Sequence, residues 1–246
     1  MKLDFRTDGG IGARAILGMI VLEADETIEH EFSRMMALPG VALYHNRIAM
    51  VPEIRPDTLV RMANDLPASA RLLPPSSRFD AIGFGCTSAS TVIGSDNVAR
   101  AIEGACPGAR VTDPLKAIIA AGRFLGATRL GFVTPYIPEV SARMRRTLEK
   151  AGYEIAGFGS FEAGDDRVVA RITGASILAA IETVAAQAPC DAVVVSCTNL
   201  RCLDLINVAE KRIGVPVLSS NQALAWHMLR LAGIDDIRPR FGRLFS

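Results

Sequence analysis

The sequence predicts an α/β protein of two pseudo-symmetric lobes, each a parallel sheet flanked by helices, with a site in the cleft between them. Short apolar runs of strand length alternate with segments of helical length along the chain, and this order favours parallel sheets with right-handed crossovers. Two of the runs share one context, Asp80-Ala leading to Cys86-Thr and Asp191-Ala leading to Cys197-Thr. This repeat indicates that the fold itself is repeated.

The first half of the chain carries three expected strands, at residues 14–22, 41–45 and 80–85. The acidic segment 23–29 suits a helix N-terminus, and Arg55-Pro56-Asp57 begins a second helix with proline in its first turn. Two more helices are expected, at residues 95–106 and 115–125. The segment before residue 14 is polar and glycine-rich, and is expected to be a loose lead-in.

The pattern then begins again. Strands are expected at 129–134, 153–157, 191–196 and 215–218, and helices at 138–151, 175–186, 203–213 and 221–231. Cys197 and Cys86 are 197 − 86 = 111 positions apart, and adding 111 to Asp25 gives Tyr136. We therefore predict an N-terminal lobe at 1–115, a C-terminal lobe at 116–220, and a terminal helix in 221–246 that packs back across both lobes.

Composition excludes several classes of protein. Half of the 246 residues are hydrophobic and 22% are charged, which allows a sizeable core, while a net charge of +1 gives no reason to expect nucleic acid as a partner. The longest apolar run, 15–22, is shorter than the ~20 residues that span a bilayer, so no membrane association is expected. Five irregularly spaced cysteines and a start without an apolar leader favour a cytoplasmic protein with free thiols.

Each repeated cysteine stands where a predicted strand ends, and ligands of open α/β sheets bind at that edge. Two thiols placed in this way suggest an acid and a base that work on opposite faces of one carbon. The alternative is a buried structural thiol at each position, which the matched context disfavours. Cys106 and Cys190 are expected to be structural. Cys202 is ambiguous, and a structural role is favoured for it.

Short polar side chains surround the two thiols in the sequence. They could hold a substrate carboxylate together with nearby backbone N–H groups, and they are Thr87, Ser88, Thr198 and Asn199. Tyr136 follows a strand and could donate to an oxyanion, or it could be an ordinary half-buried tyrosine. No metal or other cofactor is expected, because the cysteines lack zinc-ligand spacing and no Gly-x-Gly-x-x-Gly follows a strand.

The segments Cys86-Thr-Ser-Ala-Ser90 and Ser196-Cys197-Thr-Asn-Leu-Arg201 resemble the paired motifs of the aspartate/glutamate racemase superfamily. With Thr134-Pro-Tyr136 and Ser219-Ser-Asn221-Gln222, they look most like its branch of maleate cis-trans isomerases and arylmalonate decarboxylases. The resemblance implies a cofactor-free, homo-oligomeric enzyme acting on a small carboxylate. The decarboxylases of that branch have glycine at the first cysteine position, so Cys86 favours an isomerase or racemase. In a maleate isomerase, Cys197 would carry the covalent adduct.

Two positions depart from that resemblance. Where maleate isomerases carry asparagines that face the substrate carboxylate, this chain has Asp25 and, by alignment, Asp166. A carboxylate there would repel a second substrate carboxylate and attract an amine or amide. Residues 22–27 are similar to the ectoine-utilisation branch of the superfamily, whose substrates are thought to be diaminobutyrate derivatives. The alternative for Asp25 is a helix N-cap that points away from the site.

The function expected from these observations is a cofactor-independent racemase or isomerase that acts on an amino-acid derivative or a dicarboxylate through two cysteines. One alternative is a maleate cis-trans isomerase with a covalent Cys197 adduct. Others are an arylmalonate-type decarboxylase and a non-catalytic, two-lobed binding protein for a small acid.

Overall fold

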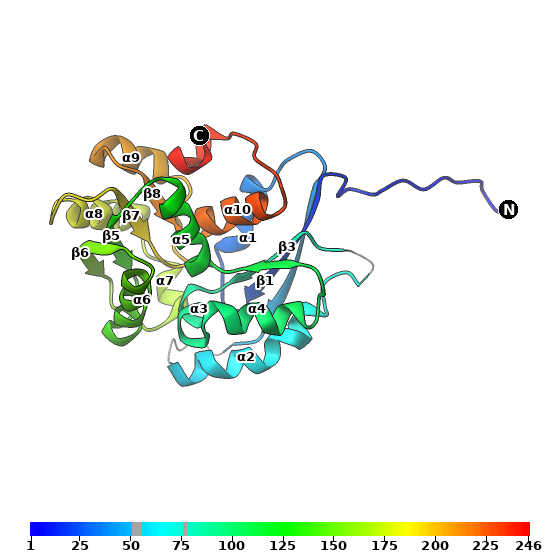
Figure 1. The fold of residues 1–246 in the computed structure, drawn as a ribbon, viewed down its shortest axis with the longest axis horizontal. Helices are drawn as coiled ribbons and strands as arrows, with labels where there is room; N and C mark the ends of the chain where they lie inside the picture. The colour runs from blue at the N-terminus through cyan, green and yellow to red at the C-terminus, as the bar shows by residue number, and fades with distance from the viewer. Residues whose placement is uncertain (51–55, 76–77) are drawn as a thin grey trace.

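The computed structural model describes residues 1–50, 56–75 and 78–246, and its strands form two four-stranded parallel sheets (Figure 1). The first sheet has the order β2-β1-β3-β4 and the second the order β6-β5-β7-β8, so the two orders coincide when the numbers shift by four. This equivalence confirms the predicted pair of similar α/β lobes. The strands are β1 (Ala15–Leu22), β2 (Val41–Ile48), β3 (Ala81–Gly85), β4 (Arg110–Thr112), β5 (Arg129–Thr134), β6 (Glu154–Ser160), β7 (Ala192–Val195) and β8 (Val217–Ser219).

Helices cover the sheets and connect their strands (Figure 1). The last of them, α10, packs along α5 and contacts β3 and β4 of the first sheet as well as β8 of the second. Arg55, expected in a helix start, lies outside the described residues; the limits predicted for the lobes stay a prediction. The helices are α1 (Ile28–Met35), α2 (Pro56–Ala70), α3 (Thr87–Ile93), α4 (Ser95–Glu103), α5 (Pro114–Phe124), α6 (Pro138–Lys150), α7 (Asp166–Val169), α8 (Gly174–Ala185), α9 (Ile206–Ile213) and α10 (Ser220–Leu231), followed by the 3-10 turns Pro239–Phe241 and Arg243–Phe245.

In the part of the chain that the structure describes, no helix combines the length and the apolar character needed to cross a bilayer.

Strand order creates one topological switch point in each sheet. β1 pairs with both β2 and β3, so the chain leaves β1 toward one side of the sheet and leaves β3 toward the other. The same relation holds for β5 and β7. Ligands of open α/β sheets bind outside the carboxyl ends of such strands. Asp25 and Cys86 follow β1 and β3, and Tyr136 and Cys197 follow β5 and β7.

Glycines in β3 allow helices to pack closely on the strand that leads to Cys86. A Cβ atom at Gly83 would lie 2.6 Å from Met228 Sδ on α10, and one at Gly85 would lie 2.7 Å from Ile28 Cδ1 on α1. Both separations are shorter than a van der Waals contact, so a larger residue would force the Met228 or Ile28 side chain, or the helix that carries it, to move.

The aspartate of each Asp-Ala repeat has a structural role. Asp80 Oδ2 accepts a hydrogen bond from Ile16 N at 2.8 Å, and Asp191 Oδ2 accepts from Thr128 N and Arg129 N, both at 2.8 Å. Each carboxylate therefore ties the start of the third strand of a lobe to the start of the first. The repeated motif fixes the strands at one end and presents the cysteine at the other.

Candidate active site

Cys86 begins helix α3 at the end of β3. Its backbone is extended, with φ −145° and ψ 113°, and its sulfur accepts a hydrogen bond from Ala89 N at 3.3 Å. The Ser88 hydroxyl lies 3.5 Å from the same sulfur. The thiol is thus the N-cap of α3, and a helix N-terminus favours the negative charge of a thiolate.

Cys197 has the same place in the second lobe but different surroundings. The chain after β7 runs through an irregular loop until α9 begins at Ile206. The sulfur accepts a hydrogen bond from Asn199 N at 3.4 Å, within that loop. The hydroxyl of Tyr136, after β5, also interacts with the Cys197 thiol and lowers its pKa. Tyr136 itself is buried.

Burial favours the protonated form of both thiols. Burial raises the pKa of Cys86 to about 12, against the opposing effects of Ser88 and of the Ala89 N–H. Burial likewise raises the pKa of Cys197 well above its ordinary value, and the nearby carboxylate of Asp166 raises it further. Burial is also the main cause of the raised pKa of Tyr136, to which both thiols contribute. The two cysteines and the tyrosine thus share one electrostatic environment.

Two buried carboxyl groups belong to that environment. Asp25 and Asp166 are 3% and 6% exposed, and each raises the pKa of both thiols. Burial, followed by the charge of Asp25, raises the pKa of Asp166 to about 7. Burial also raises the pKa of Asp25, although two backbone N–H groups oppose it.

The two oxygens of Asp25 have different roles. Oδ1 accepts hydrogen bonds from Thr27 N and Ile28 N, both at 2.8 Å, and so caps the turn that enters α1. Oδ2 is buried and accepts no hydrogen bond of normal geometry. The Thr198 hydroxyl, which donates to the Gly85 carbonyl at 3.4 Å, lies near enough to the Asp25 carboxyl group to lower its pKa. The N-cap of α1 is Thr27, and not Asp25 as one alternative had it; Asp25 Oδ1 instead closes the turn that precedes the helix.

The predicted polar groups differ in how fully they are occupied. The Thr87 hydroxyl lies 2.9 Å from that of Ser220, and both residues are buried. Asn199 is occupied on both sides of its amide. Its Oδ1 accepts from Glu26 N at 2.9 Å, and its Nδ2 donates to the Asp166 carbonyl at 3.0 Å. In this structure Asn199 thus ties the Cys197 loop to the first lobe, although we expected it to bind the substrate.

Sequence reasoning missed Glu31, a buried carboxylate beside the Cys197 loop. It accepts hydrogen bonds from Cys202 N at 2.8 Å and Leu203 N at 2.9 Å, and from Asn221 Nδ2 at 2.8 Å. One signal was available, because Glu31 lies on the apolar stripe of α1 that Ile28 and Phe32 define.

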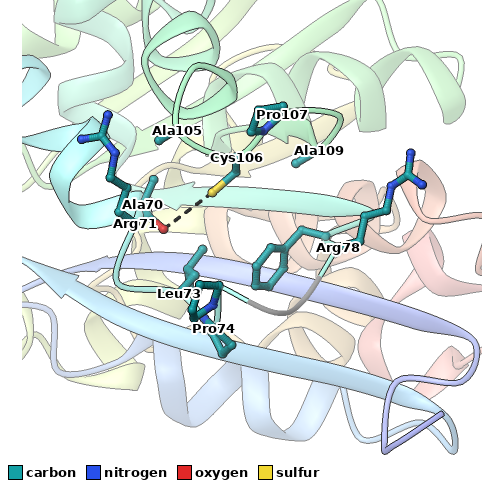
Figure 2. A pocket seen from close by; sticks show the side chains of 11 residues that line it. Ala70, Arg71, Leu73, Pro74, Arg78, Ala105, Cys106, Pro107 and Ala109 are labelled. Carbon is teal, nitrogen blue, oxygen red and sulfur yellow. Dashed lines mark hydrogen bonds between the residues drawn. The ribbon is translucent and has the colours of Figure 1, made fainter.

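A cavity of about 530 Å³ in the first lobe is separate from the candidate site residues (Figure 2). Its lining residues precede β3 and β4, at the end of the sheet opposite to Cys86. Figure 2 shows Arg71 and Arg78 on opposite sides of it, so their guanidinium groups do not converge on a common point. The thiol of Cys106 donates to the Ala70 carbonyl at 3.6 Å, an interaction typical of a structural cysteine.

Fold and site together define a two-lobed, pseudo-symmetric α/β protein with one thiol at the switch point of each sheet. The chain belongs to the arylmalonate decarboxylase family, which it matches over residues 95–245. This membership confirms the resemblance to the maleate isomerase and arylmalonate decarboxylase branch of the aspartate/glutamate racemase superfamily.

Individual relatives point to the same branch. A maleate isomerase of Nocardia farcinica is 27% identical, over 95% of this chain and 96% of the relative. An arylmalonate decarboxylase of Bordetella bronchiseptica is 33% identical over 53% of this chain and 55% of the relative. A solved structure of a Nocardia farcinica maleate cis-trans isomerase, a cysteine-to-serine mutant with a covalently bound succinylcysteine intermediate, is 25% identical and has a TM-score of 0.84, covering 94% of this chain and 98% of the other. The relatives thus support isomerase or decarboxylase chemistry.

Proposed function

We propose that this chain is a cofactor-independent racemase or isomerase of a small carboxylate, in which Cys86 and Cys197 act as paired acid and base. The observation that supports this most is the equivalent position of the two thiols after β3 and β7. In the racemase reaction, one thiolate removes the proton from the carbon next to the carboxylate. The other thiol then gives its proton to the opposite face of that carbon, and the two cysteines exchange roles in the reverse direction.

A substrate carboxylate would bind beside the thiols, at short hydroxyl groups and at the start of α3. Thr87, Ser88 and Thr198 are buried there, and a helix N-terminus attracts negative charge. Tyr136 would donate to the oxygen on which charge develops when the proton leaves. We place this site in the cleft between the lobes, as the sequence predicts.

The carboxyl groups of Asp25 and Asp166 favour an amino-acid derivative over a dicarboxylate. Asp25 Oδ2 is buried and accepts no hydrogen bond of normal geometry, so a ligand N–H would satisfy it, whereas a ligand carboxylate would meet repulsion. Both aspartates raise the pKa of the two thiols. A protonated amine bound beside them would offset these charges, and would thereby favour the thiolate that the reaction requires.

The experiment replaces each cysteine separately, as Cys86→Ala and Cys197→Ala. Enantiopure amino acids and their N-acyl derivatives are incubated with each variant in D2O, and racemisation is followed by circular dichroism and deuterium uptake by mass spectrometry. Loss of one acid–base group should lower the rate by at least about 100-fold. Cys106→Ser serves as the control and should retain activity, because this half-buried cysteine only donates to a backbone carbonyl. Full activity in either alanine variant would refute the proposal.

Maleate cis-trans isomerisation is the second candidate, favoured by the match to maleate isomerases over nearly the whole chain. In that reaction the Cys197 thiolate adds to one carbon of the double bond and the Cys86 thiol protonates the other, which gives a succinyl adduct. After rotation about the new single bond, the Cys86 thiolate takes a proton back from that carbon and the Cys197 thiolate leaves, which releases the trans product. It predicts a succinyl adduct on Cys197 after maleate is added, visible by peptide mass spectrometry. An unmodified Cys197 peptide during turnover of maleate would exclude this route.

A further inference from the structure

Hydrogen bonds join the loop that carries Cys197, in the second lobe, to residues of the first lobe. Two bonds involve Asn199, whose Oδ1 accepts from Glu26 N at 2.9 Å and whose carbonyl accepts from the Thr27 hydroxyl at 3.0 Å. Glu31 makes the next contacts, since its Oε1 accepts from the backbone N–H groups of residues 202 and 203. The second lobe thus presents its thiol on a loop whose far end is held by a carboxylate of the first.

Glu31 also reaches the start of α10. Its Oε2 accepts from Asn221 Nδ2 at 2.8 Å, and the same nitrogen donates to the Thr198 carbonyl at 2.8 Å. Because Thr198 directly follows Cys197, Glu31 supports the loop at both ends, directly at residues 202 and 203 and through Asn221 at residue 198. The carboxyl group is 3% exposed, so water does not replace these contacts.

The first lobe needs no such support. Cys86 leads directly into α3, whose first turn supplies the N–H that its sulfur accepts. Adding the offset of 111 to Glu31 gives Ala142, which cannot accept a hydrogen bond through its side chain. Of these two equivalent positions, only residue 31 carries a carboxylate. It supports Cys197, the cysteine that no helix directly follows.

We infer that Glu31 is the positioning residue of Cys197, a buried carboxylate that holds the Cys197 loop in register with the first lobe and α10. Its hydrogen bonds go to the loop backbone and to Asn221, and not to the sulfur. Three N–H donors converge on its two oxygens, an arrangement that fits the ionised form. The effect of this positioning on catalysis rests on the proposed function. The claim that Glu31 keeps the Cys197 loop in place does not depend on it.

The test compares Glu31→Gln with Glu210→Gln. In Glu31→Gln the amide oxygen can still accept from the loop, but the NH2 group faces the NH2 group of Asn221. Glu210 is the matched control, because it is buried as well, at 4% exposed against 3% for Glu31, and accepts from Val217 N at 3.1 Å and from Arg243 N at 3.1 Å and 3.2 Å. Both variants lose buried hydrogen bonds, so both should have a lower thermal midpoint.

The readout is the ratio of Cys197 to Cys86 alkylation by iodoacetamide, measured by peptide mass spectrometry at alkaline pH without substrate. Glu31→Gln should release the loop and raise this ratio on the order of tenfold, while Glu210→Gln leaves it at the wild-type value. If Glu31→Gln does not accumulate as folded protein, Asn221→Ala removes the link between Glu31 and Thr198 and should raise the same ratio. An unchanged ratio in the variant that folds overturns the inference.

Activity adds a second, separable readout. Misplacement of one reacting sulfur should lower kcat of Glu31→Gln on the order of tenfold to a hundredfold while KM changes little, and Glu210→Gln should keep both. A raised alkylation ratio with unchanged kcat would contradict the catalytic part of the inference and count against Cys197 in the proposed function. A wild-type alkylation ratio together with lost activity would instead refute only the claim that Glu31 keeps the loop in place.

Discussion

The pKa values of the Cys86 and Cys197 thiols are raised by burial and by nearby carboxylates, and single substitutions can separate these two causes. Burial is the main cause at both cysteines, and Asp166 is the first neighbouring charge that raises the pKa of Cys197. The sulfur of a base must lose its proton, so these residues set how readily the proposed reaction begins.

Asp166→Asn should lower the pKa of Cys197, because it removes a negative charge that disfavours the thiolate. The pKa is measured from the rate of Cys197 alkylation by iodoacetamide as a function of pH, followed by peptide mass spectrometry, which separates Cys197 from the other free cysteines. Asp235→Asn, at an exposed position, is the control and should leave the titration unchanged. A Cys197 pKa that stays the same or rises in Asp166→Asn would contradict this description of the site.

Residue patterns predicted some of these groups and missed others. The repeated Asp-Ala…Cys-Thr context and the offset of 111 indicated Cys86, Cys197 and Tyr136, and the structure gives these three one electrostatic environment. The role of Asn199 as a tie between lobes was not predictable, because its partners are Glu26 and Asp166, 173 and 33 positions away. The donors of Glu31 are similarly distant along the chain.

At the scale of elements, Cys86 has a structural role besides the proposed chemical one. Its sulfur caps α3, and loss of an N-cap typically costs ~1 kcal/mol. Cys86→Ala should therefore be less stable than Cys86→Ser by about that amount, since serine is a good cap. Urea unfolding of the two variants measures the difference. The same comparison at Cys197 is the reference, because its sulfur also accepts a backbone N–H, from Asn199, but begins no helix, so a smaller difference is expected there. Equal stabilities of the Cys86 variants would argue against the capping role.

Close approach of α10 to β3 gives a second prediction at this scale. Gly83→Ala places a Cβ atom 2.6 Å from Met228 Sδ and should destabilise the fold by about 1–3 kcal/mol through overpacking. Gly164→Ala is the control, because its nearest contact would be an ordinary 3.8 Å from Ile137 Cγ2. Unfolding midpoints in urea check both variants, and an unaffected Gly83→Ala would mean that the helix yields easily.

Most elements were predictable from the alternation of apolar runs and helical segments, with ends that differ by a few residues. Three short elements were not assigned. The strand β4 has three residues and α7 has four, too few for a periodic pattern. The helix α3 consists of Thr-Ser-Ala-Ser-Thr-Val-Ile, whose hydroxyl and β-branched residues have modest helix propensity. Its sulfur cap and burial specify a helix that propensity alone does not.

For the whole molecule, buried carboxyl groups couple stability to pH. Burial raises the pKa of Asp166 and of Glu31 to about 7, above their ordinary values of 3.8 and 4.5. Between those values the folded chain holds protons that the unfolded chain has lost, so stability should fall as pH rises from about 5 through about 7. Each group can contribute about 1.4 kcal/mol per unit of pKa shift.

The measurement is urea unfolding across that pH interval for the wild type and for Asp166→Asn. The variant should show a shallower decline, because its amide does not titrate. The comparison between the two proteins cancels the opposite effect of His227, whose pKa burial lowers to about 4. A variant with an unaltered slope would contradict the raised pKa of Asp166.

Ties between the lobes are concentrated around the Cys197 loop. Beside the buried bonds of Asn199 and Glu31, two exposed ion pairs connect them, Arg171–Glu26 at 2.7 Å and Arg34–Asp204 at 2.6 Å. Exposed pairs contribute little to stability, so among these polar contacts the buried bonds hold the lobes together more strongly. The homo-oligomer that the family resemblance implies stays a prediction.

The central claim is that sulfurs from two lobes act on one small acid from opposite sides. A crystal structure of the chain with a bound small carboxylate tests it most directly. We predict both the Cys86 and Cys197 sulfurs near contact distance, ~3.5 Å, from the same carbon atom, one on each face. Sulfurs more than about 10 Å apart, or a ligand that contacts only one of them, would contradict the account.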